Sequence, residues 1–251
     1  MLNYKAPENL LAGKTILITG VSSGIGRVAA QTYAHYGANV VLLGRCSSTL
    51  QALETQIHSE QHGRVCNTLC CRFDLQENDY SAYQALAEQI ATRFNALDGL
   101  LLNAGILGQL QPLEHLPLSE WQQVLHVNLT ANLLLVQALL PLLRQSQAAS
   151  IIFTSSGVGR KGRANWGSYA ISKFATEGMM QVLADEMSDT TIRVNAINPG
   201  ATRTRMRALA RPDEDPLRLK TAAEIMPLYL YLMGDDSSDC HGQSLDAQPA
   251  R

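Results

Sequence analysis

The amino-acid sequence predicts an α/β fold, a doubly wound parallel sheet of about seven strands with helices on both faces, in a single domain. Short runs rich in leucine and β-branched residues alternate with helix-length segments along the whole chain. These runs are apolar almost throughout, which is typical of strands buried on both faces of a parallel sheet. The chain has 251 residues, 46% of them apolar, enough for one large core, and it contains no repeat or low-complexity linker that would divide it.

The predicted elements follow one another in a regular order. Strands are expected at 14–19 (KTILIT), 39–43 (NVVLL), 65–73, 98–102 (DGLLL), 150–154 (SIIFT) and 191–197 (TIRVNAI). Helices are expected between them at 25–36, 48–61, 78–94, 119–145 and 168–187. Residues 201–221 are charged and interrupted by Pro212 and Pro216, so we expect that segment to be irregular.

Composition excludes several classes of protein. The net charge of -2 argues against a general nucleic-acid binder. The first fourteen residues lack an apolar signal region, and the apolar run 133–143 is interrupted by Gln137 and Pro141, so we expect a cytoplasmic protein without a membrane segment. Five cysteines do not make a disulfide framework. Those in VCNTLCC (65–71) lack metal-ligand spacing, so we expect small strand residues there and no metal site.

A glycine-rich turn, TGVSSGIG at 19–26, directly follows the first strand and opens the first helix. Glycines there allow close approach of the backbone to a pyrophosphate, whose charge meets the helix N-terminal amides. The turn therefore predicts a dinucleotide contact by Gly20, Ser22, Ser23, Gly24, Ile25 and Gly26. Its spacing differs from the G-x-G-x-x-G fingerprint of a generic Rossmann enzyme.

A tyrosine and a lysine stand four residues apart in GSYAISKFATEG at 167–178. Four residues are about one helical turn, so Tyr169 and Lys173 leave the same helix face. A nearby ammonium favours the phenolate and lowers the pKa of tyrosine from its ordinary value of about 10. Such a phenol can give a proton to a carbonyl oxygen or take one from an alcohol. Taken alone, the pair also fits a surface helix with a solvated lysine and a packed tyrosine.

Five motifs in one order make the chain resemble the short-chain dehydrogenase/reductase family. They are the T-G-x-x-x-G-x-G turn, NAG (103–105), VNL with Asn128, TSSGVG with Ser156 thirteen residues before Tyr169, and NPG (198–200) followed by Thr202 and Thr204. The segments GRANWGSYAISKFATEGMMQVLADEM and IMPLYLYLMGDD resemble the YciK-like bacterial oxidoreductases of that family. The resemblance implies one Rossmann-type domain over 1–251 with a short substrate lid at about 201–221.

The resemblance also implies a role for each of four side chains. Tyr169 would be the general acid/base, and Lys173 would also hold the nicotinamide ribose. Ser156 would donate a hydrogen bond to the substrate oxygen, although Ser155 stands beside it. The thirteen-residue spacing to the tyrosine favours Ser156. Asn128 would hold a water that links Lys173 to solvent; its alternative is a cap or a bridge at a helix kink.

The end of the second predicted strand, VVLLGRC, indicates which nicotinamide cofactor is used. Gly44 occupies the position where the family carries an acidic residue in its NAD-dependent members, and Arg45 follows. A guanidinium can bind the 2′-phosphate of NADP, whereas a carboxylate would repel it. We therefore expect NADP (NADPH) rather than NAD; the alternative is a solvated Arg45. The other contacts implied by the resemblance come from Asp74, Leu75, Asn103, Ala104, Gly105, Tyr169, Lys173, Pro199, Gly200, Thr202 and Thr204.

Substrate and partners are less specified. Arg203, Arg205, Arg207 and Arg211, with GRKGR at 159–163, form either a solvated basic face or a handle for an anionic substrate. Helices 119–145 and 168–187 correspond to those through which the family pairs, so we expect a homodimer or homotetramer, unless the leucine-rich part is buried inside the subunit.

Two functions stay open. The first is an oxidoreductase that transfers a hydride between NADP(H) and a small-molecule carbonyl or alcohol substrate. The second is a non-catalytic nicotinamide-dinucleotide sensor or regulatory protein. The presence of Ser156, Tyr169 and Lys173 together favours the enzyme. A nucleic-acid module on residues 203–211 is set aside, because that stretch lacks interleaved aromatic residues.

Overall fold

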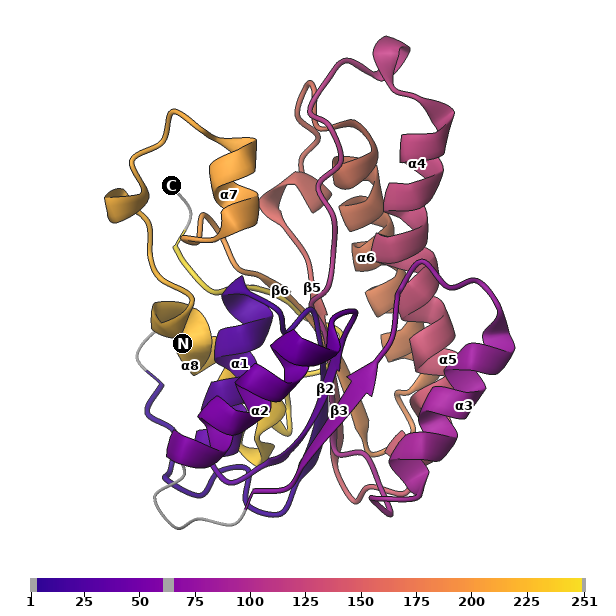
Figure 1. The fold of residues 1–251 in the computed structure, drawn as a ribbon, viewed down its shortest axis with the longest axis vertical. Coiled ribbons are helices and arrows are strands. Elements are labelled where there is room, and N and C mark those ends of the chain that lie inside the picture. The colour runs from indigo at the N-terminus through magenta and orange to yellow at the C-terminus, as the bar shows by residue number, and fades with distance from the viewer. Residues whose placement is uncertain (1–3, 61–65, 250–251) are drawn as a thin grey trace.

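The computed structural model describes residues 4–60 and 66–249, and within them it contains the predicted parallel sheet (Figure 1). Seven strands pair in the order β3-β2-β1-β4-β5-β6-β7, all parallel, in this described part. They are β1 (Thr15–Thr19), β2 (Asn39–Gly44), β3 (Thr68–Arg72), β4 (Gly99–Leu102), β5 (Ala149–Thr154), β6 (Ile192–Asn198) and β7 (Ser244–Asp246). The predicted fold class is confirmed.

The helices connect successive strands. They are α1 (Gly24–His35), α2 (Ser47–Glu60), α3 (Tyr80–Ala91), α4 (Leu118–Leu125), α5 (Ala131–Leu143), α6 (Gly167–Glu186), α7 (Arg205–Ala210) and α8 (Met226–Met233). The single helix predicted at 119–145 is α4 and α5, joined by a π-helical turn at His126–Thr130. The predicted helix 48–61 and strand 65–73 each include one residue, 61 and 65, that lies outside the described residues.

Two layers of helices cover the sheet (Figure 1). On one face, α1, α2 and α8 pack on strand residues such as Ile16, Val40 and Ile152. On the other face, α3, α5 and α6 pack on the strand residues that stand next to these in the sequence, such as Leu17, Val41 and Ile151. Successive strand residues point to opposite faces of the sheet, and helices cover both faces, so two adjacent strand residues are both buried. This explains the unbroken apolar runs.

Three elements lay outside the prediction. Strand β7 has three residues, SLD, and carries no apolar run. Helix α8, MPLYLYLM, is buried on most sides, so its apolar residues show no helical period. Helix α7 lies inside the segment that was expected to be irregular: the Thr204 hydroxyl accepts the Arg207 N–H at 3.1 Å, and the helix ends before Pro212.

The chain changes direction along the sheet at β1. Strand β1 pairs with β2 on one side and with β4 on the other, and ligands of open α/β sheets bind at the carboxyl ends beside such a switch. The Thr19 hydroxyl accepts the backbone N–H groups of Asn103 and Ala104, each at 2.9 Å. The loop after β4 is therefore fixed beside the glycine-rich turn.

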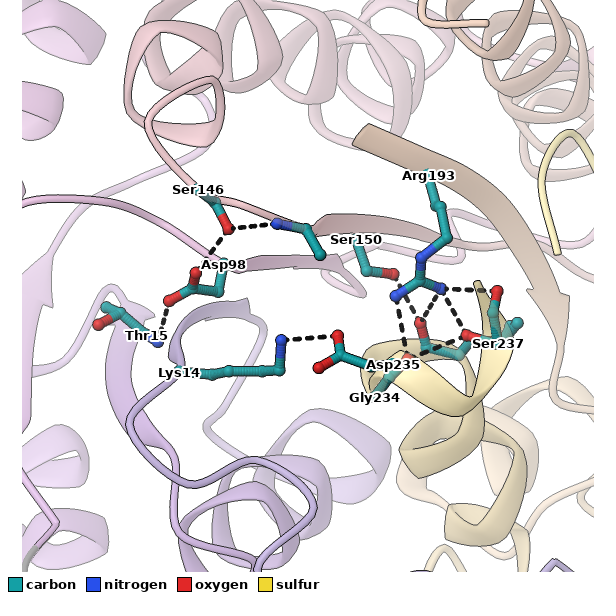
Figure 2. A network of polar contacts seen from close by, with 11 residues as sticks. Lys14, Thr15, Asp98, Ser146, Ser150, Arg193, Gly234, Asp235 and Ser237 are labelled. Atoms are coloured by element: carbon teal, nitrogen blue, oxygen red, sulfur yellow. Dashed lines mark hydrogen bonds and ion pairs between the residues drawn. The ribbon is translucent and has the colours of Figure 1, made fainter. Parts of the chain in front are cut away.

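The opposite, amino-terminal edge of the sheet carries a polar network (Figure 2). The guanidinium of Arg193 donates to the carbonyls of Leu232 and Gly234, each at 3.0 Å. The Asp98 carboxylate accepts the Thr15 N–H at 2.8 Å and the Ser146 hydroxyl at 2.6 Å. These bonds tie α8 and the loop before β5 to the strand ends.

The apolar helical segment Leu118–Leu143 is long enough to cross a membrane by length and composition, with a mean hydropathy of 1.5. It is the one helix in the described residues that passes this test, and core helices of soluble proteins pass it too. Here α5 packs on α3, and α4 packs on α6. The absence of a membrane segment stays a prediction.

The cysteines of the 65–71 run that the structure describes are free thiols. Cys70 and Cys71 lie on β3, as predicted, whereas Cys66 precedes the strand, and of the three Cys71 alone is buried. Burial raises the pKa of the Cys71 thiol to about 12. In the described part of the chain, no group of three His, Cys, Asp or Glu residues could hold a metal ion.

Candidate active site

A cavity of about 310 Å³ opens at the carboxyl ends of the strands. Its wall combines the glycine-rich turn, the ends of β2 to β6 and part of the segment 202–210. Of the predicted site residues it includes Gly20, Ser22, Ser23, Gly24, Ile25, Arg45, Asp74, Leu75, Asn103, Ala104, Gly105, Ser156, Tyr169, Lys173, Pro199, Gly200, Thr202 and Thr204. Gly26 and Asn128 do not line it; both lie just behind the wall.

The glycine-rich turn has a geometry that suits an anion. Gly20 has a φ of 72°, and a Cβ atom there would lie 2.9 Å from the Ala104 Cα. A Cβ at Gly26 would lie 2.5 Å from the Gly20 carbonyl oxygen, so this glycine serves the packing of the turn. The N-cap Ser23 makes no side-chain bond to the helix, so no side chain caps the first amides of α1. The turn therefore fits a pyrophosphate.

Tyr169 and Lys173 project from the first turns of α6 into this cavity. They are 8% and 3% exposed, and the Lys173 ammonium lies 5.7 Å from the centre of the Tyr169 ring. The ammonium donates a hydrogen bond to the Thr154 carbonyl at 2.8 Å. A Cβ at Gly159 would lie 2.8 Å from the Lys173 Cβ, so the loop after β5 approaches the lysine because it carries a glycine there.

The pKa of the tyrosine moves opposite to the expected direction. Burial raises the pKa of Tyr169 to about 12, and a hydrogen bond with Ser156 opposes this increase. The expected decrease is wrong for this structure, because the loss of hydration outweighs the hydrogen bond with Ser156. Burial also lowers the pKa of Lys173 to about 8, and the Glu177 carboxylate opposes that decrease.

The two adjacent serines after β5 have different partners. The Ser156 side chain lies close enough to Tyr169 to act against the increase in its pKa, and Ser156 lines the cavity. Ser155 also lines the cavity, but it is buried and its hydroxyl donates to the Glu177 carboxylate. The structure thus brings Ser156, and not Ser155, together with the tyrosine.

Asn128 is fully buried in the π turn between α4 and α5. Its side chain accepts the Ile106 N–H at 2.8 Å and donates to the Ile106 carbonyl and the Ser172 hydroxyl, each at 3.0 Å. The Asn128 side chain therefore joins the loop after β4 to α6. A Cβ at Gly105 would lie 3.2 Å from the Asn128 Oδ1 and 3.8 Å from the Lys173 Nζ, so the asparagine and the lysine approach the same glycine.

Arg45 and Asp74 mark the side of the cavity where the second and third strands end. Arg45 is exposed and has no hydrogen bond or ion pair to any residue that the structure describes. Asp74 accepts the Gln76 N–H at 3.1 Å. A Cβ at Gly44 would lie 3.2 Å from the Leu50 Cδ2, so a larger side chain there would meet α2.

The arginines of residues 201–221 and of the GRKGR stretch differ in their partners. Arg207 forms two bonds to Glu214, at 2.6 and 2.9 Å, and Arg203 donates to the Pro216 carbonyl at 2.8 Å. Arg160 of the GRKGR stretch binds Asp246 at 2.8 Å. Arg205 lines the cavity and has no such partner in the described part of the chain. Three of the seven basic side chains of the supposed face, Arg160, Arg203 and Arg207, are therefore engaged within the protein.

Several residues near the site were missed from the sequence, among them Trp166, Gln248 and Glu177. The Trp166 ring lies 5.9 Å from the Tyr169 ring and belongs to an apolar wall with Val158 and Ala210. The Gln248 amide donates to the Pro199 carbonyl at 2.8 Å and so holds the NPG loop. Glu177 lies one turn beyond Lys173, a spacing that could have identified it. Nothing in the sequence connects residue 248 to residue 199.

Comparison with known proteins gives consistent matches. The sequence profile described as short chain dehydrogenase matches residues 14–215. The oxidoreductase YciK of Escherichia coli strain K12 is 53% identical over 255 residues, covering 100% of this chain and 98% of that protein. A short chain dehydrogenase from Shigella flexneri 2a strain 301, complexed with NADP, superposes with a TM-score of 0.92 at 53% identity, over 97% of this chain and 100% of that one. Another from Escherichia coli CFT073, complexed with NADPH, gives 0.93 at 53% identity, over the same shares of 97% and 100%.

Proposed function

The chain belongs to the short-chain dehydrogenase/reductase family, and on that premise we propose that it transfers a hydride between NADP(H) and a carbonyl or alcohol substrate. Membership makes it an oxidoreductase; the cofactor preference, the tyrosine's role and the substrate class are the proposal. The observation that carries it is that Ser156, Tyr169 and Lys173 lie together in the wall of a cavity that fits a dinucleotide.

We assign the proton to Tyr169. With a pKa of about 12 its hydroxyl is protonated at neutral pH, which suits donation to a carbonyl oxygen. Ser156 donates a second hydrogen bond to the same oxygen and stabilises the charge that develops there. A bound NADPH supplies the hydride. The apolar wall that includes Trp166 keeps water away from these hydroxyls.

Lys173 and Asn128 support this proton transfer in the proposal. At neutral pH the ammonium of Lys173, with a pKa of about 8, is mostly charged and stabilises the phenolate left after proton donation. It would also hold the ribose of the cofactor. Asn128 positions the loop after β4 through Ile106, and its proximity to Gly105 supports a water-linked path from the lysine to solvent.

NADP is proposed over NAD on two grounds. Arg45 offers an exposed guanidinium at the strand end where NAD-dependent enzymes carry a carboxylate. Relatives at 53% identity are described as complexes with NADP and with NADPH. The proposed setting is the cytoplasm, on the sequence grounds given above.

The test is NADPH oxidation by the purified protein against aldehydes, diketones, quinones, ketosteroids and 3-ketoacyl thioesters, with NADH in parallel. Turnover with NADPH that is lost on Tyr169→Phe supports the proposal. Equal turnover with NADH contradicts the role of Arg45. Tight NADPH binding without turnover on any compound would favour the sensor function instead.

An anionic substrate is a finer part of the proposal. In the lid that we propose for about 201–221, Arg205 lines the cavity without a protein partner, so its charge is available to a carboxylate or phosphate. Arg205→Gln should raise KM for acidic carbonyl substrates about tenfold and leave neutral ones unchanged. Arg211→Gln, an exposed arginine of the same segment that does not line the cavity, is the matched control.

A homodimer or homotetramer is proposed from the exposed apolar side chains of α5 and α6. Leu133 is 43% exposed, Phe174 45% and Val182 60%. Ile171, Phe174, Gly178 and Val182 follow one another at helical spacing on α6, with open space beside Gly178. Phe174→Glu should convert the assembly to monomers, as measured by light scattering; an assembly of unchanged mass would contradict this interface.

A further inference from the structure

A third side chain stands on the face of α6 that carries the tyrosine and the lysine. Tyr169, Lys173 and Glu177 are spaced by four residues, so all three lie along one side of the helix. Glu177 is 7% exposed. A carboxylate is rarely buried to this degree unless charged or polar groups surround it. The groups that compensate the burial of the Glu177 carboxylate therefore have to be identified.

Three hydrogen-bond donors reach the Oε1 atom of Glu177 from three different segments. The Ser155 hydroxyl comes from the residue after β5, next to Ser156. The Arg160 guanidinium, 3.3 Å away, comes from the loop that leads to α6. The Ser244 hydroxyl, 2.8 Å away, comes from β7. One carboxylate thus joins the strand end beside the catalytic serine to two other segments.

The bonds continue outward from Glu177 toward the surface. Arg160 also binds the Asp246 carboxylate at 2.8 Å and the Ser244 hydroxyl at 2.6 Å. Asp246 in turn accepts the Asn198 amide of the NPG loop at 2.8 Å. The side chain of Asp246 is 45% exposed, whereas the side chain of Glu177, taken without its backbone, is 9% exposed. The network has a buried carboxylate at the catalytic helix and an exposed one at its rim.

The charge of Glu177 acts on Lys173, one turn away. Burial lowers the pKa of the lysine to about 8, and the carboxylate works against that decrease. The other titratable groups that face this pair are Tyr169 on α6, Arg160 after β5 and, through Arg160, Asp246 on β7. The remaining ones on elements packed against α6 are bonded elsewhere: Glu120 to Gln109, His126 to Glu77, Arg193 to Leu232 and His241 to Ala184.

We propose that Glu177 is a positioning residue of the active site: its carboxylate holds Ser155, and with it the strand end that presents Ser156, and keeps Lys173 in its charged form. It touches neither substrate nor cofactor and acts through these two neighbours. The inference rests on the proposed function, because the serine and the lysine are positioned for that reaction.

A purely structural anchor would use the same bonds, so the experiment must separate charge from packing. Glu177→Gln keeps the acceptor oxygen and the size of the side chain while it removes the charge. Asp246→Asn also removes one negative charge from the network, but at its exposed end, and is the matched control. Ser155→Ala removes one hydrogen bond without any change of charge.

The first measurement is a ¹³C NMR titration of Lys173 in the whole protein. The chain has five lysines, so the spectrum is simple, and Lys173→Met assigns the signal. Loss of a nearby opposite charge should lower the pKa of Lys173 by about one unit in Glu177→Gln. Asp246→Asn and Ser155→Ala should leave it within about 0.3 units, because the charge beside the lysine is intact. Thermal unfolding confirms that each variant is folded.

The second measurement is kcat/KM against pH for reduction with NADPH. At pH 6 Lys173 is charged in both proteins, so Glu177→Gln should be near wild type. At pH 8.5 a one-unit decrease in the pKa leaves about an eighth as much charged lysine, and kcat/KM should fall by about the same factor. Ser155→Ala should lower kcat at every pH without moving the alkaline limb, because only the placement of Ser156 changes.

An unchanged pKa of Lys173 in Glu177→Gln would overturn the proposal, as would an equal decrease in Asp246→Asn. A decrease confined to Glu177→Gln, with a matching shift of the alkaline limb, would support it. If the wild-type protein turns over no substrate, the proposed hydride transfer fails, and the NMR titration still decides by itself whether Glu177 sets the charge of Lys173.

Discussion

The two edges of the sheet both carry buried polar side chains, but these side chains have different partners. At the amino edge, Arg193 is 8% exposed and donates to the carbonyls of Leu232, Gly234 and Ser237 (Figure 2). At the carboxyl edge, Tyr169 is equally buried, yet its hydroxyl faces a cavity. Arg45 and Arg205 at that edge have no partner among the described residues.

The two edges differ in what their polar groups bind. Hydrogen bonds at the amino edge stay within the protein, so they contribute to the stability of the fold. At the carboxyl edge, groups kept free of internal partners remain available to a ligand. Burial alone therefore does not identify a site; buried groups that line a cavity do. The predictions below test this division, starting with the largest expected effect.

Tyr169→Phe should separate activity from stability at the carboxyl edge. Loss of a general acid typically lowers kcat by about a hundredfold to ten-thousandfold. Only one hydroxyl is removed, so the melting temperature should move by no more than about 2 °C. Stopped-flow or steady-state NADPH oxidation, with NADPH binding followed by fluorescence, checks both. Loss of NADPH binding together with turnover would instead give the hydroxyl a role in holding the cofactor.

Arg193→Met should produce the opposite result at the amino edge. Three backbone carbonyls would lose a buried charged donor, which should lower the free energy of unfolding by about 3 kcal/mol. For a chain of this size the melting temperature would fall by about 6–12 °C. The kcat of the folded protein at 25 °C should stay within about twofold of wild type. A large loss of kcat in a fully folded Arg193→Met variant would contradict the proposed division of roles between the two edges.

Arg45→Gln should weaken the binding of NADPH by about tenfold to a hundredfold, because the 2′-phosphate loses a charge-assisted bond. Binding of NADH, which lacks that phosphate, should be unchanged and serves as the internal control. Isothermal titration with both cofactors measures the ratio. Equal weakening for the two would show that Arg45 does not read the phosphate.

Asp98→Asn is expected to have the smallest effect. The carboxylate accepts from Thr15 and Ser146, and an amide can keep one of these bonds while its NH₂ group meets a donor. The free energy of unfolding should fall by about 1 kcal/mol, measured by urea denaturation, with kcat unaffected. Ser146→Ala, which removes one partner of the same carboxylate, should cost a similar amount. A loss of NADPH affinity in either variant would show that the two edges are coupled.

Much of the fold follows from the sequence because strands buried on both faces must be apolar at every position. This requirement made β1 and β2 visible, and the sheet they belong to is as predicted. Strand β7 was not located, since three residues at the sheet edge need little apolar character. Helix α7 was not expected either, because its stability depends on the Thr204 cap and on the Arg207–Glu214 pair rather than on a buried face.

Local spacing also indicated the core of the candidate site, since Tyr169 and Lys173 share a helix face by their separation alone. The raised pKa of Tyr169 was not foreseen, because the depth of burial is a property of the packed structure. Likewise, the bond from Gln248 to Pro199 joins residues that are distant in sequence and became visible only in the fold. The roles of these residues in turnover stay predictions.

The π turn at His126–Thr130 has a consequence for insertions and deletions. Such a turn holds one more residue than an α-helical turn, and each residue of a helix rotates the chain by about 100°. Deleting one residue there would make α4 and α5 continuous and rotate the whole of α5 relative to α4. The side of α5 that packs on α3 would then turn away from it, and Asn128 would leave Ile106. Point substitutions in this region do not change the rotation of α5 relative to α4. The number of residues between 118 and 143 is therefore more strictly constrained than their identities.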